Sequence, residues 1–452
     1  MGILERLERQ RTAQQEPDEG RARKDAPARN LQSDTYASLK QRIHNEMIDA
    51  VNKDKRDDFQ DAEEKEAYFR AQIEAIVNSR DIDLSRAERN RLMDEVYDDV
   101  AGFGPLEPLL QNPDITEIMV NGADKVYVEI GGKIQLSNVK FNDNAHVMNV
   151  LNRIVSLVGR RIDEANPMVD ARLPDGSRVN AVIAPVALTG PTITIRKFFR
   201  KPLSVGDLVH LGSVSPKMMN FLEACVKGRV NIIVSGGTGS GKTTLLGILS
   251  GFIPDDERIV TIEDAAELQL RQEHVITMES RPANVEGVGL ITIRDLVRNA
   301  LRMRPDRIVV GEVRSGETLD MLQAMNTGHD GSLTTAHANS PRDLLSRLET
   351  MVLMSGIEMP VKAIREQIAS AVDIIVHQAR MRDGSRKIVS ITEVVGMEGD
   401  VITLQDIYTY QLEGVDSTGR QKGSFVASGV RPAFMDDLAA MGIMVKDAWF
   451  QN

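Results

Sequence analysis

The chain has little cysteine and lacks long apolar runs. Its 452 residues contain one cysteine, Cys225, which excludes an internal disulfide framework and a cysteine zinc site and favours a reducing cytoplasm. No window reaches the roughly 20 apolar residues that span a bilayer, and the start MGILERLERQ lacks the apolar centre of a signal peptide. We therefore expect membrane contact only through a partner or a surface helix.

Aromatic residues are also scarce, at 4% of the chain, and the formal net charge is −11. Proteins that bind single-stranded nucleic acid stack bases on aromatic side chains and carry basic surfaces. The composition therefore argues against nucleic acid as a partner. With 42% hydrophobic and 27% charged residues the chain is otherwise globular, and its length predicts about three domains.

Periodicity divides the first half of the chain into three segments. Residues 1–32 mix charged residues with Gln, Pro and Ala, and they predict a disordered arm because so little apolar surface cannot offset the ordering entropy. Residues 33–102 repeat apolar residues at intervals of three and four, with a capping box at 85–88, and predict a small helical bundle. Residues 103–205 alternate around a Gly131-Gly132 turn and predict an α+β domain.

Residues 206–452 predict an α/β domain. Short continuous apolar runs, such as 230–234 and 308–310, are separated by helical stretches. Runs of this kind are typical of strands buried on both faces of a parallel sheet. From about residue 400 the chain is rich in Gly, Asp and Met and shows no clear pattern, so we treat it as a C-terminal extension.

The stretch GGTGSGKTT at 236–244 matches the P-loop pattern between an apolar run and a helix. Glycines allow consecutive N–H groups and the positive end of the next helix to surround a polyphosphate. The predicted nucleotide-binding residues are Gly236, Gly237, Thr238, Gly239, Ser240, Gly241, Lys242, Thr243 and Thr244. Lys242 would reach the terminal phosphates, and the Thr243 hydroxyl would bind Mg²⁺. The alternative, a glycine-rich loop with an accidental lysine, leaves the glycines unexplained.

Carboxylates follow two of the later apolar runs. Glu263 ends the run at 258–262, Glu267 comes one turn on, and Glu312 follows the run at 307–310. Parallel strands bring these ends to the same crevice as the P-loop, where one acid would hold Mg²⁺ and another would activate the attacking water. Solvated surface acids are the alternative.

Two of the seven histidines, His329 and His337, flank one short apolar run. They could bond a γ-phosphate or couple it to a neighbouring subunit, and they could equally be core histidines satisfied by the backbone. No third ligand accompanies them, so zinc is not expected.

The order of motifs resembles the type II/type IV secretion ATPase superfamily. GGTGSGKTT corresponds to Walker A, TIEDAAELQL (261–270) to the aspartate box, ALRMRPDRIVVGEVR (300–314) to Walker B and AMNTGHDGSLTTAHANS (324–340) to the histidine box. FGPLEPLL (103–110) and DARLPDGSRVNAVIAP (170–185) are similar to the CpaF/TadA-type ATPases that assemble tight-adherence pili.

The resemblance implies roles for single residues. ATP and Mg²⁺ would lie between an N-terminal α+β domain and a RecA-like ATPase domain, with Glu312 as the Walker B acid. His329 and His337 would sense the γ-phosphate, and two arginines of the N-terminal domain, Arg178 and Arg196, would reach the phosphates. Glu263 is the preferred base, but Ala265 replaces the proline of the common EDP motif, so Glu267 stays an alternative.

The resemblance implies a cytoplasmic homohexameric motor at the inner-membrane face. ATP hydrolysis would drive a platform protein of a type IV pilus, and the N-terminal helices would contact that platform or regulators.

One rival function is a DNA-transporting ATPase of the conjugation type, because a basic stripe is formed by Arg294, Arg298, Arg302 and Arg304. We expect these arginines to meet phosphates or a neighbour's carboxylates instead. A second rival is a non-hydrolysing nucleotide switch. An ABC transporter ATPase is disfavoured because no LSGGQ-like signature follows the P-loop.

Overall fold

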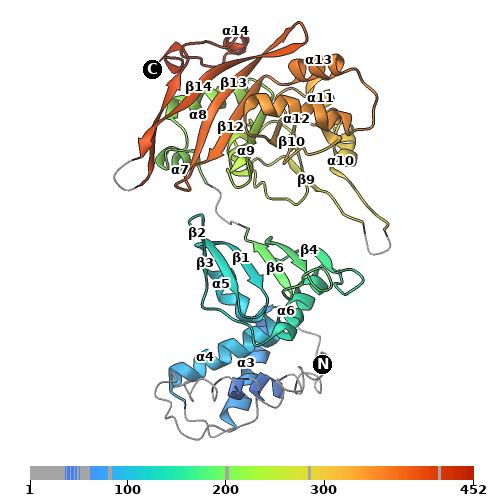
Figure 1. Ribbon diagram of the computed structural model, residues 1–452, viewed down its shortest axis with the longest axis vertical. Helices are drawn as coiled ribbons and strands as arrows, with labels where there is room; N and C mark the ends of the chain where they lie inside the picture. The colour runs from blue at the N-terminus through green and yellow to red at the C-terminus, as the bar shows by residue number, and fades with distance from the viewer. Residues whose placement is uncertain are drawn as a thin grey trace, which may run out of the picture. The chain divides into compact units, whose positions relative to one another are not determined.

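The computed structural model describes residues 62–79, 84–198, 203–283, 287–415 and 419–451, and part of 36–50. The chain divides into two compact units (Figure 1). The first comprises Met1–Glu129 and Ile134–Lys197, and the second Ile130–Lys133 and Phe198–Asn452. The arm predicted at residues 1–32 lies outside the described residues.

The first unit contains a helical core and a six-stranded sheet. Helices α3 (Ala62–Asn78) and α4 (Arg86–Ala101) pack through Ile73, Val77 and Leu92. The capping box predicted before α4 is confirmed, because the Ser85 hydroxyl accepts from Glu88 N–H while the Glu88 carboxylate accepts from Ser85 N–H.

The six-stranded sheet has the order β3-β2-β1-β6-β5-β4. Its strands are β1 (Ile115–Asn121), β2 (Val126–Ile130), β3 (Lys133–Leu136), β4 (Met168–Arg172), β5 (Arg178–Val182) and β6 (Thr192–Arg196). The segments η1 (Gly104–Leu106) and α5 (Glu107–Gln111) precede it, and α6 (Asn144–Leu157) lies between β3 and β4 in the chain. The turn from β2 to β3 uses Gly131 and Gly132 with φ of 56° and 76°, as the hairpin prediction required.

The second unit is built on a nine-stranded sheet of order β15-β14-β13-β12-β7-β11-β10-β8-β9. The parallel part consists of β7 (Ile232–Gly236), β8 (Ile259–Glu263), β9 (Val275–Glu279), β10 (Arg307–Val310), β11 (Leu333–His337) and β12 (Ile374–Arg380). The antiparallel part consists of β13 (Arg386–Glu398), β14 (Val401–Val415) and β15 (Gln421–Ala427). The predicted α/β class with a RecA-like parallel core is confirmed.

Helices cover both faces of the parallel strands, which explains their continuous apolar runs. Ile232 and Val234 of β7 belong to one core, whereas Ile233 belongs to the other. The first core includes α8 (Pro216–Lys227) and α9 (Lys242–Ser250), and the second includes α10 (Ile293–Ala300), α11 (Glu317–Asn326), α12 (Pro341–Leu353) and α13 (Val361–Ala371). The remaining segments are α7 (Val205–His210), α14 (Met435–Ala440) and η2 (Asp447–Trp449).

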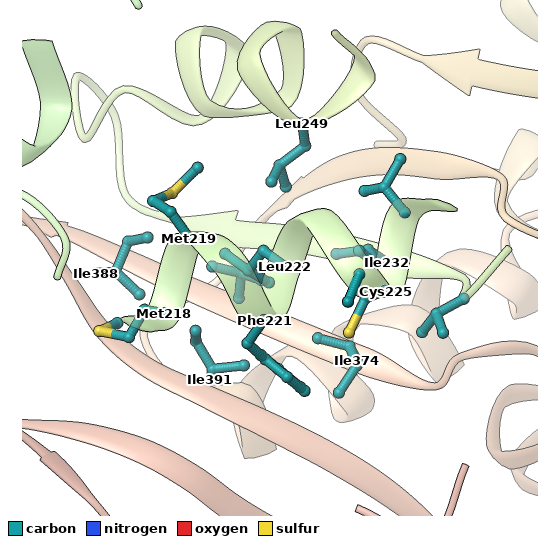
Figure 2. Close-up of a cluster of buried hydrophobic side chains, with 14 of the residues drawn as sticks. Met218, Met219, Phe221, Leu222, Cys225, Ile232, Leu249, Ile374, Ile388 and Ile391 are labelled. Atoms are coloured by element: carbon teal, nitrogen blue, oxygen red, sulfur yellow. The ribbon is translucent and has the colours of Figure 1, made fainter. Parts of the chain in front are cut away.

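The C-terminal extension completes the first of these cores. Figure 2 shows Phe221 and Cys225 of α8 packed against strand residues such as Ile374 and Ile391. Phe450 packs on Phe221 with ring centroids 5.7 Å apart, and the Tyr408 hydroxyl donates to the Trp449 carbonyl at 2.6 Å. Residues beyond 400 therefore cover part of the core of the second unit. Within the described residues, no helix is both long enough and apolar enough to cross a membrane.

Candidate nucleotide site

The loop between β7 and α9 has the backbone geometry that the P-loop motif predicts. Gly239 and Gly241 have φ of 69° and 95°, a region that favours glycine. A Cβ on Gly236 would lie 2.1 Å from the Gln378 carbonyl oxygen, so the neighbouring strand β12 leaves no room for a side chain. Gly241 caps α9 without a side-chain hydrogen bond, which leaves the first N–H groups of the helix without a side-chain acceptor, as an anion site requires.

Lys242 lies at the centre of a charged cluster. Its side chain is buried, and its Nζ donates to the Gly237 carbonyl at 3.2 Å. The same atom lies 3.9 Å from Glu312 Oε1 and 3.4 Å from His337 Nε2. Burial lowers the pKa of Lys242; Glu312 opposes this shift and Arg314 adds to it.

Glu312 follows β10 and joins the cluster from the other side. Its Oε2 accepts from Arg314 Nε at 2.7 Å, and its Oε1 lies 3.2 Å from His337 Nε2. That Oε1 atom is nevertheless buried with no hydrogen-bond partner, as is Ser240 Oγ in the loop. Buried atoms left open in this way suit an oxygen-binding cation or a phosphate.

His337 ends β11 directly opposite Gly236 of β7. Burial lowers the pKa of its imidazole, the Lys242 charge lowers it further, and Glu312 partly opposes both. The ring is therefore neutral at pH 7, and one of its nitrogens is available as an acceptor.

Glu263, at the end of β8, is almost fully buried and fixes the turn after it. Its carboxylate accepts the backbone N–H groups of Glu267 at 3.0 Å and Leu268 at 3.2 Å. A Cβ on Gly311 would lie 2.8 Å from Glu263 Cγ, so glycine there lets the ends of β8 and β10 approach closely. The side chain of Glu267 is half-buried on this turn. The choice between the two glutamates as base stays a prediction.

The residues around Lys242 fit a magnesium nucleotide. Among the described residues, no three His, Cys, Asp or Glu side chains gather into a metal site. Mg²⁺ usually keeps one or two protein ligands and completes its coordination with phosphate oxygens and water. Thr243 in the first turn of α9 and the open Oε1 of Glu312 are the groups that would serve.

The sequence did not predict the role of Arg314. Its guanidinium bridges Glu312 Oε2 and Asp264 Oδ2, with Nη1 3.1 Å from the latter, and so links the ends of β10 and β8. Its place two residues after Glu312 in GEVR was the available signal, since arginine pairs readily with carboxylates that lie close together.

His329 lies at the opposite end of β11 from the cluster around Lys242, and its predicted role at the γ-phosphate, directly or towards a neighbouring subunit, stays a prediction. β11 runs parallel to β7, with Leu333 opposite Ile232, so His329 precedes the amino end of the strand while His337 occupies the carboxyl end. The strand alone separates them by roughly 13 Å at 3.3 Å per residue. The His329 carbonyl accepts from the Ser332 hydroxyl at 2.7 Å.

Arg178 and Arg196 lie on neighbouring strands of the first unit. They face each other across β5 and β6, with Arg172 of β4 opposite Arg178. Arg196 Nε lies 2.9 Å from Glu117 Oε1. Their predicted contact with the phosphates stays a prediction.

The basic stripe is partly neutralised within the chain. Arg294 Nε and Arg298 Nε donate to the two carboxylate oxygens of the buried Asp320, at 2.8 Å and 2.7 Å. Within one chain these two arginines join α10 to α11. Their predicted contact with phosphates or a neighbour's carboxylates stays a prediction.

Three kinds of comparison place these features among known proteins. A family model described as "Type II/IV secretion system protein" matches residues 99–417. The chain is 40% identical over 309 residues to a putative conjugal transfer protein of Mycobacterium tuberculosis, a match that covers 67% of this chain and 87% of that protein. It is 34% identical over 300 residues to the type IV secretion system protein VirB11 of Brucella abortus, with coverage of 60% and 83%.

Solved structures of similar proteins were also found. The VirB11 ATPase from the Brucella suis type IV secretion system is 31% identical, with a TM-score of 0.36, and the match covers 64% of this chain and 94% of that one. The pilus retraction motor PilT with bound ADP is 18% identical, with a TM-score of 0.46 and coverage of 73% and 84%.

Proposed function

The chain belongs to the type II/IV secretion system protein family, and from this membership and its P-loop site we propose that it is an ATPase motor of a secretion or pilus-assembly machine. The observation that carries the proposal is the meeting of Lys242, Glu312 and His337 at the carboxyl ends of neighbouring parallel strands. A nucleotide switch needs only the loop, Lys242 and the Mg²⁺ ligands, whereas Glu263 at the end of β8 adds a second buried carboxylate that can activate water, so hydrolysis is favoured over a passive switch.

Each side chain has a chemical task in this proposal. The loop amides and Lys242 bind the phosphates, and Thr243 and Glu312 would hold Mg²⁺, which would supply positive charge against the transferred phosphoryl group. His337, neutral and 3.4 Å from Lys242, donates its ring N–H to an oxygen of the terminal phosphate. Glu263, at the end of β8, is the preferred base that takes the proton from the attacking water, and Glu267 on the same turn is the alternative.

Coupling to movement follows the resemblance to the CpaF/TadA-type ATPases. Arg178 and Arg196 would bring the N-terminal sheet to the phosphates, and release of the cleaved phosphate would free it again. In a homohexamer at the inner-membrane face, successive closures would drive a platform protein of a tight-adherence pilus, and the N-terminal helices would contact the platform or regulators.

A DNA-transporting ATPase of the conjugation type is the second candidate, because one relative is described as a putative conjugal transfer protein. The pairing of Arg294 and Arg298 with Asp320 counts against it, since one buried carboxylate engages two of the four arginines of the basic stripe. A DNA affinity that falls steeply with salt would favour this candidate, whereas capture of inner-membrane platform proteins would favour the pilus motor.

Phosphate release by the purified chain tests the proposed activity. The wild type should hydrolyse ATP in the presence of Mg²⁺, and Lys242→Ala and Glu312→Gln should each lower kcat at least about a hundredfold because the transition-state charge loses its partners. Lys362→Ala, which truncates an exposed lysine of α13, is the control and should leave kcat unchanged. A wild type without ATPase activity, or a Lys242→Ala variant with full activity, would contradict the proposal.

A further inference from the structure

The β12–β13 hairpin lies against the P-loop on the side away from the catalytic cluster. The strand order β12-β7-β11-β10 puts β12 on one flank of β7 and the strands that carry His337 and Glu312 on the other. Gln378 of β12 pairs in register with Gly236. Its side-chain Nε2 would lie 3.3 Å from a Cβ on Gly241, so the hairpin contacts the loop at both ends.

Two arginines of this hairpin approach the apex of the loop. Arg380 and Arg386 are directly opposite each other in the β12–β13 ladder. Arg386 Nε donates to the Gly239 carbonyl at 3.3 Å, and Arg380 Nη1 would lie 3.5 Å from a Cβ on Gly239. Residues 237–239 of the loop are exposed, so the guanidinium groups border an accessible part of it.

The positive charges of Arg380 and Arg386 favour the binding of an anion beside Gly239 of the loop. Like charges directly opposite each other in a ladder repel. The carboxylate of the turn between the two arginines, Asp383, accepts hydrogen bonds from the Ser385 hydroxyl at 2.7 Å and from the backbone N–H groups of Ser385 and Gln421. A phosphate on the loop would bring negative charge close to both guanidinium groups, whose planar donors match phosphate oxygens.

We infer that Arg380 and Arg386 form a second phosphate-binding element of the nucleotide site, supplied by the same unit as the P-loop. This inference rests on the proposed function, because it assumes a nucleoside di- or triphosphate on the loop. The two arginines hold the polyphosphate from the β12 side, while Lys242, Glu312 and His337 act from the β11 and β10 side. They therefore govern nucleotide affinity more than the chemical step.

Binding of fluorescently labelled ADP to the full chain tests this assignment, alongside steady-state ATP hydrolysis. Arg380→Ala and Arg386→Ala should each weaken the Kd for ADP and raise the KM for ATP about tenfold, with kcat within about twofold of wild type. Arg386→Lys should recover part of the affinity, because it keeps the charge but loses the planar fork. Arg382→Ala, an exposed arginine of the same hairpin, is the control and should bind ADP like the wild type.

Three results would overturn the inference. One is an unchanged ADP affinity in the Arg380→Ala/Arg386→Ala double variant, and another is a loss of kcat without any change in Kd. The third is a loss of affinity that follows a lowered melting temperature and that Arg386→Lys does not reduce, which would indicate a structural role only. A wild type that binds ADP through these arginines but does not hydrolyse ATP would refute the proposed motor while supporting this inference.

Discussion

The two ends of the parallel strands both hold buried charged side chains, but these side chains differ in how completely they are hydrogen-bonded. At the carboxyl ends, Lys242, Glu312 and His337 approach one another, yet Glu312 Oε1 is left without a hydrogen bond. At the amino ends, the guanidinium of Arg307 is fully buried and bonded to Glu257 at 2.5 Å and to the Val226 carbonyl at 2.9 Å. The buried groups at the amino ends have their hydrogen bonds completed within the protein, which fits a structural role. The cluster at the carboxyl ends keeps an unpaired acceptor, which fits the predicted binding of a magnesium nucleotide.

The amino-end network also fixes the loop that contains His329. Arg307 Nη1 donates to the Gly331 carbonyl at 3.1 Å, and Asn231 Oδ1 accepts the N–H groups of Gly331 and Ser332. Gly331 has φ of 78°, and a Cβ there would lie 1.9 Å from Arg307 Nη1. Only glycine fits this position, so GHDGS owes its second glycine to packing rather than to phosphate binding.

The largest effect is expected when the amino-end network is broken. Glu257→Ala leaves the Arg307 guanidinium buried without its carboxylate, which should cost about 3–5 kcal/mol in the free energy of unfolding of the second unit. The single tryptophan, Trp449, is buried in that unit, so its fluorescence reports the transition during denaturant unfolding. At temperatures where the variant stays folded, its nucleotide affinity should match that of the wild type.

Asp256→Ala is the matched control, because it removes an exposed carboxylate from the neighbouring position. It should change the free energy of unfolding by less than about 0.5 kcal/mol. Equal effects of the two substitutions would show that the buried pair does not stabilise the amino ends as described.

The two histidines give the second test, with an effect of about tenfold. His337→Ala removes the ring proposed to donate to the terminal phosphate and should lower kcat about tenfold, the cost of one hydrogen bond to a charged group. His329→Ala should change kcat by less than about twofold, because its ring lies at the other end of β11. Steady-state ATP hydrolysis by both variants measures the difference. A loss in His329→Ala equal to that in His337→Ala would bring the amino end of the strand into the reaction, for example through a neighbouring subunit.

Local signals predicted the part of the site that depends on single strands. The glycines of 236–241 and the acids after two apolar runs needed only the rule that parallel strands end at one edge, and Lys242 and Glu312 do meet there. The Gly131-Gly132 turn and the Ser85 cap likewise depend on neighbours within four residues. Such features follow from backbone geometry, so composition and spacing are sufficient.

The spacing of residues along the chain could not predict which side chains of distant segments contact each other. His329 and His337 are eight residues apart in the chain, but the short strand between them puts them at opposite ends of the sheet. Arg294 and Arg298 bond to Asp320 only because α10 packs beside α11. The antiparallel strands β13 to β15 gave no alternation clear enough to predict, since their burial changes along each strand.

The smallest expected effect is a difference in how the free energy of unfolding depends on pH at the two ends of the parallel strands. Burial raises the pKa of Asp373, at the amino ends, to about 6, and nearby Asp330 and Glu393 add to this while the bond from Asn231 N–H opposes it. The folded state therefore binds the extra proton between about pH 4 and 6, so this group favours folding below pH 4 and loses that contribution as pH rises through 6. His337 behaves oppositely: its lowered pKa gives a contribution that is present above about pH 6.5 and is lost as pH falls.

Asp373→Asn should thus be more stable than the wild type by about 1 kcal/mol at pH 8, with the difference vanishing near pH 4, because the asparagine oxygen can still accept from Asn231 N–H without a buried charge. His337→Gln should show the reverse dependence and gain stability relative to the wild type only below about pH 6.5. Unfolding of both variants, followed by Trp449 fluorescence at pH 5 and 8, measures the two slopes. Each slope is the change with pH in the stability of a variant relative to the wild type. Slopes of the same sign for the two variants would contradict the opposite pKa shifts described for Asp373 and His337.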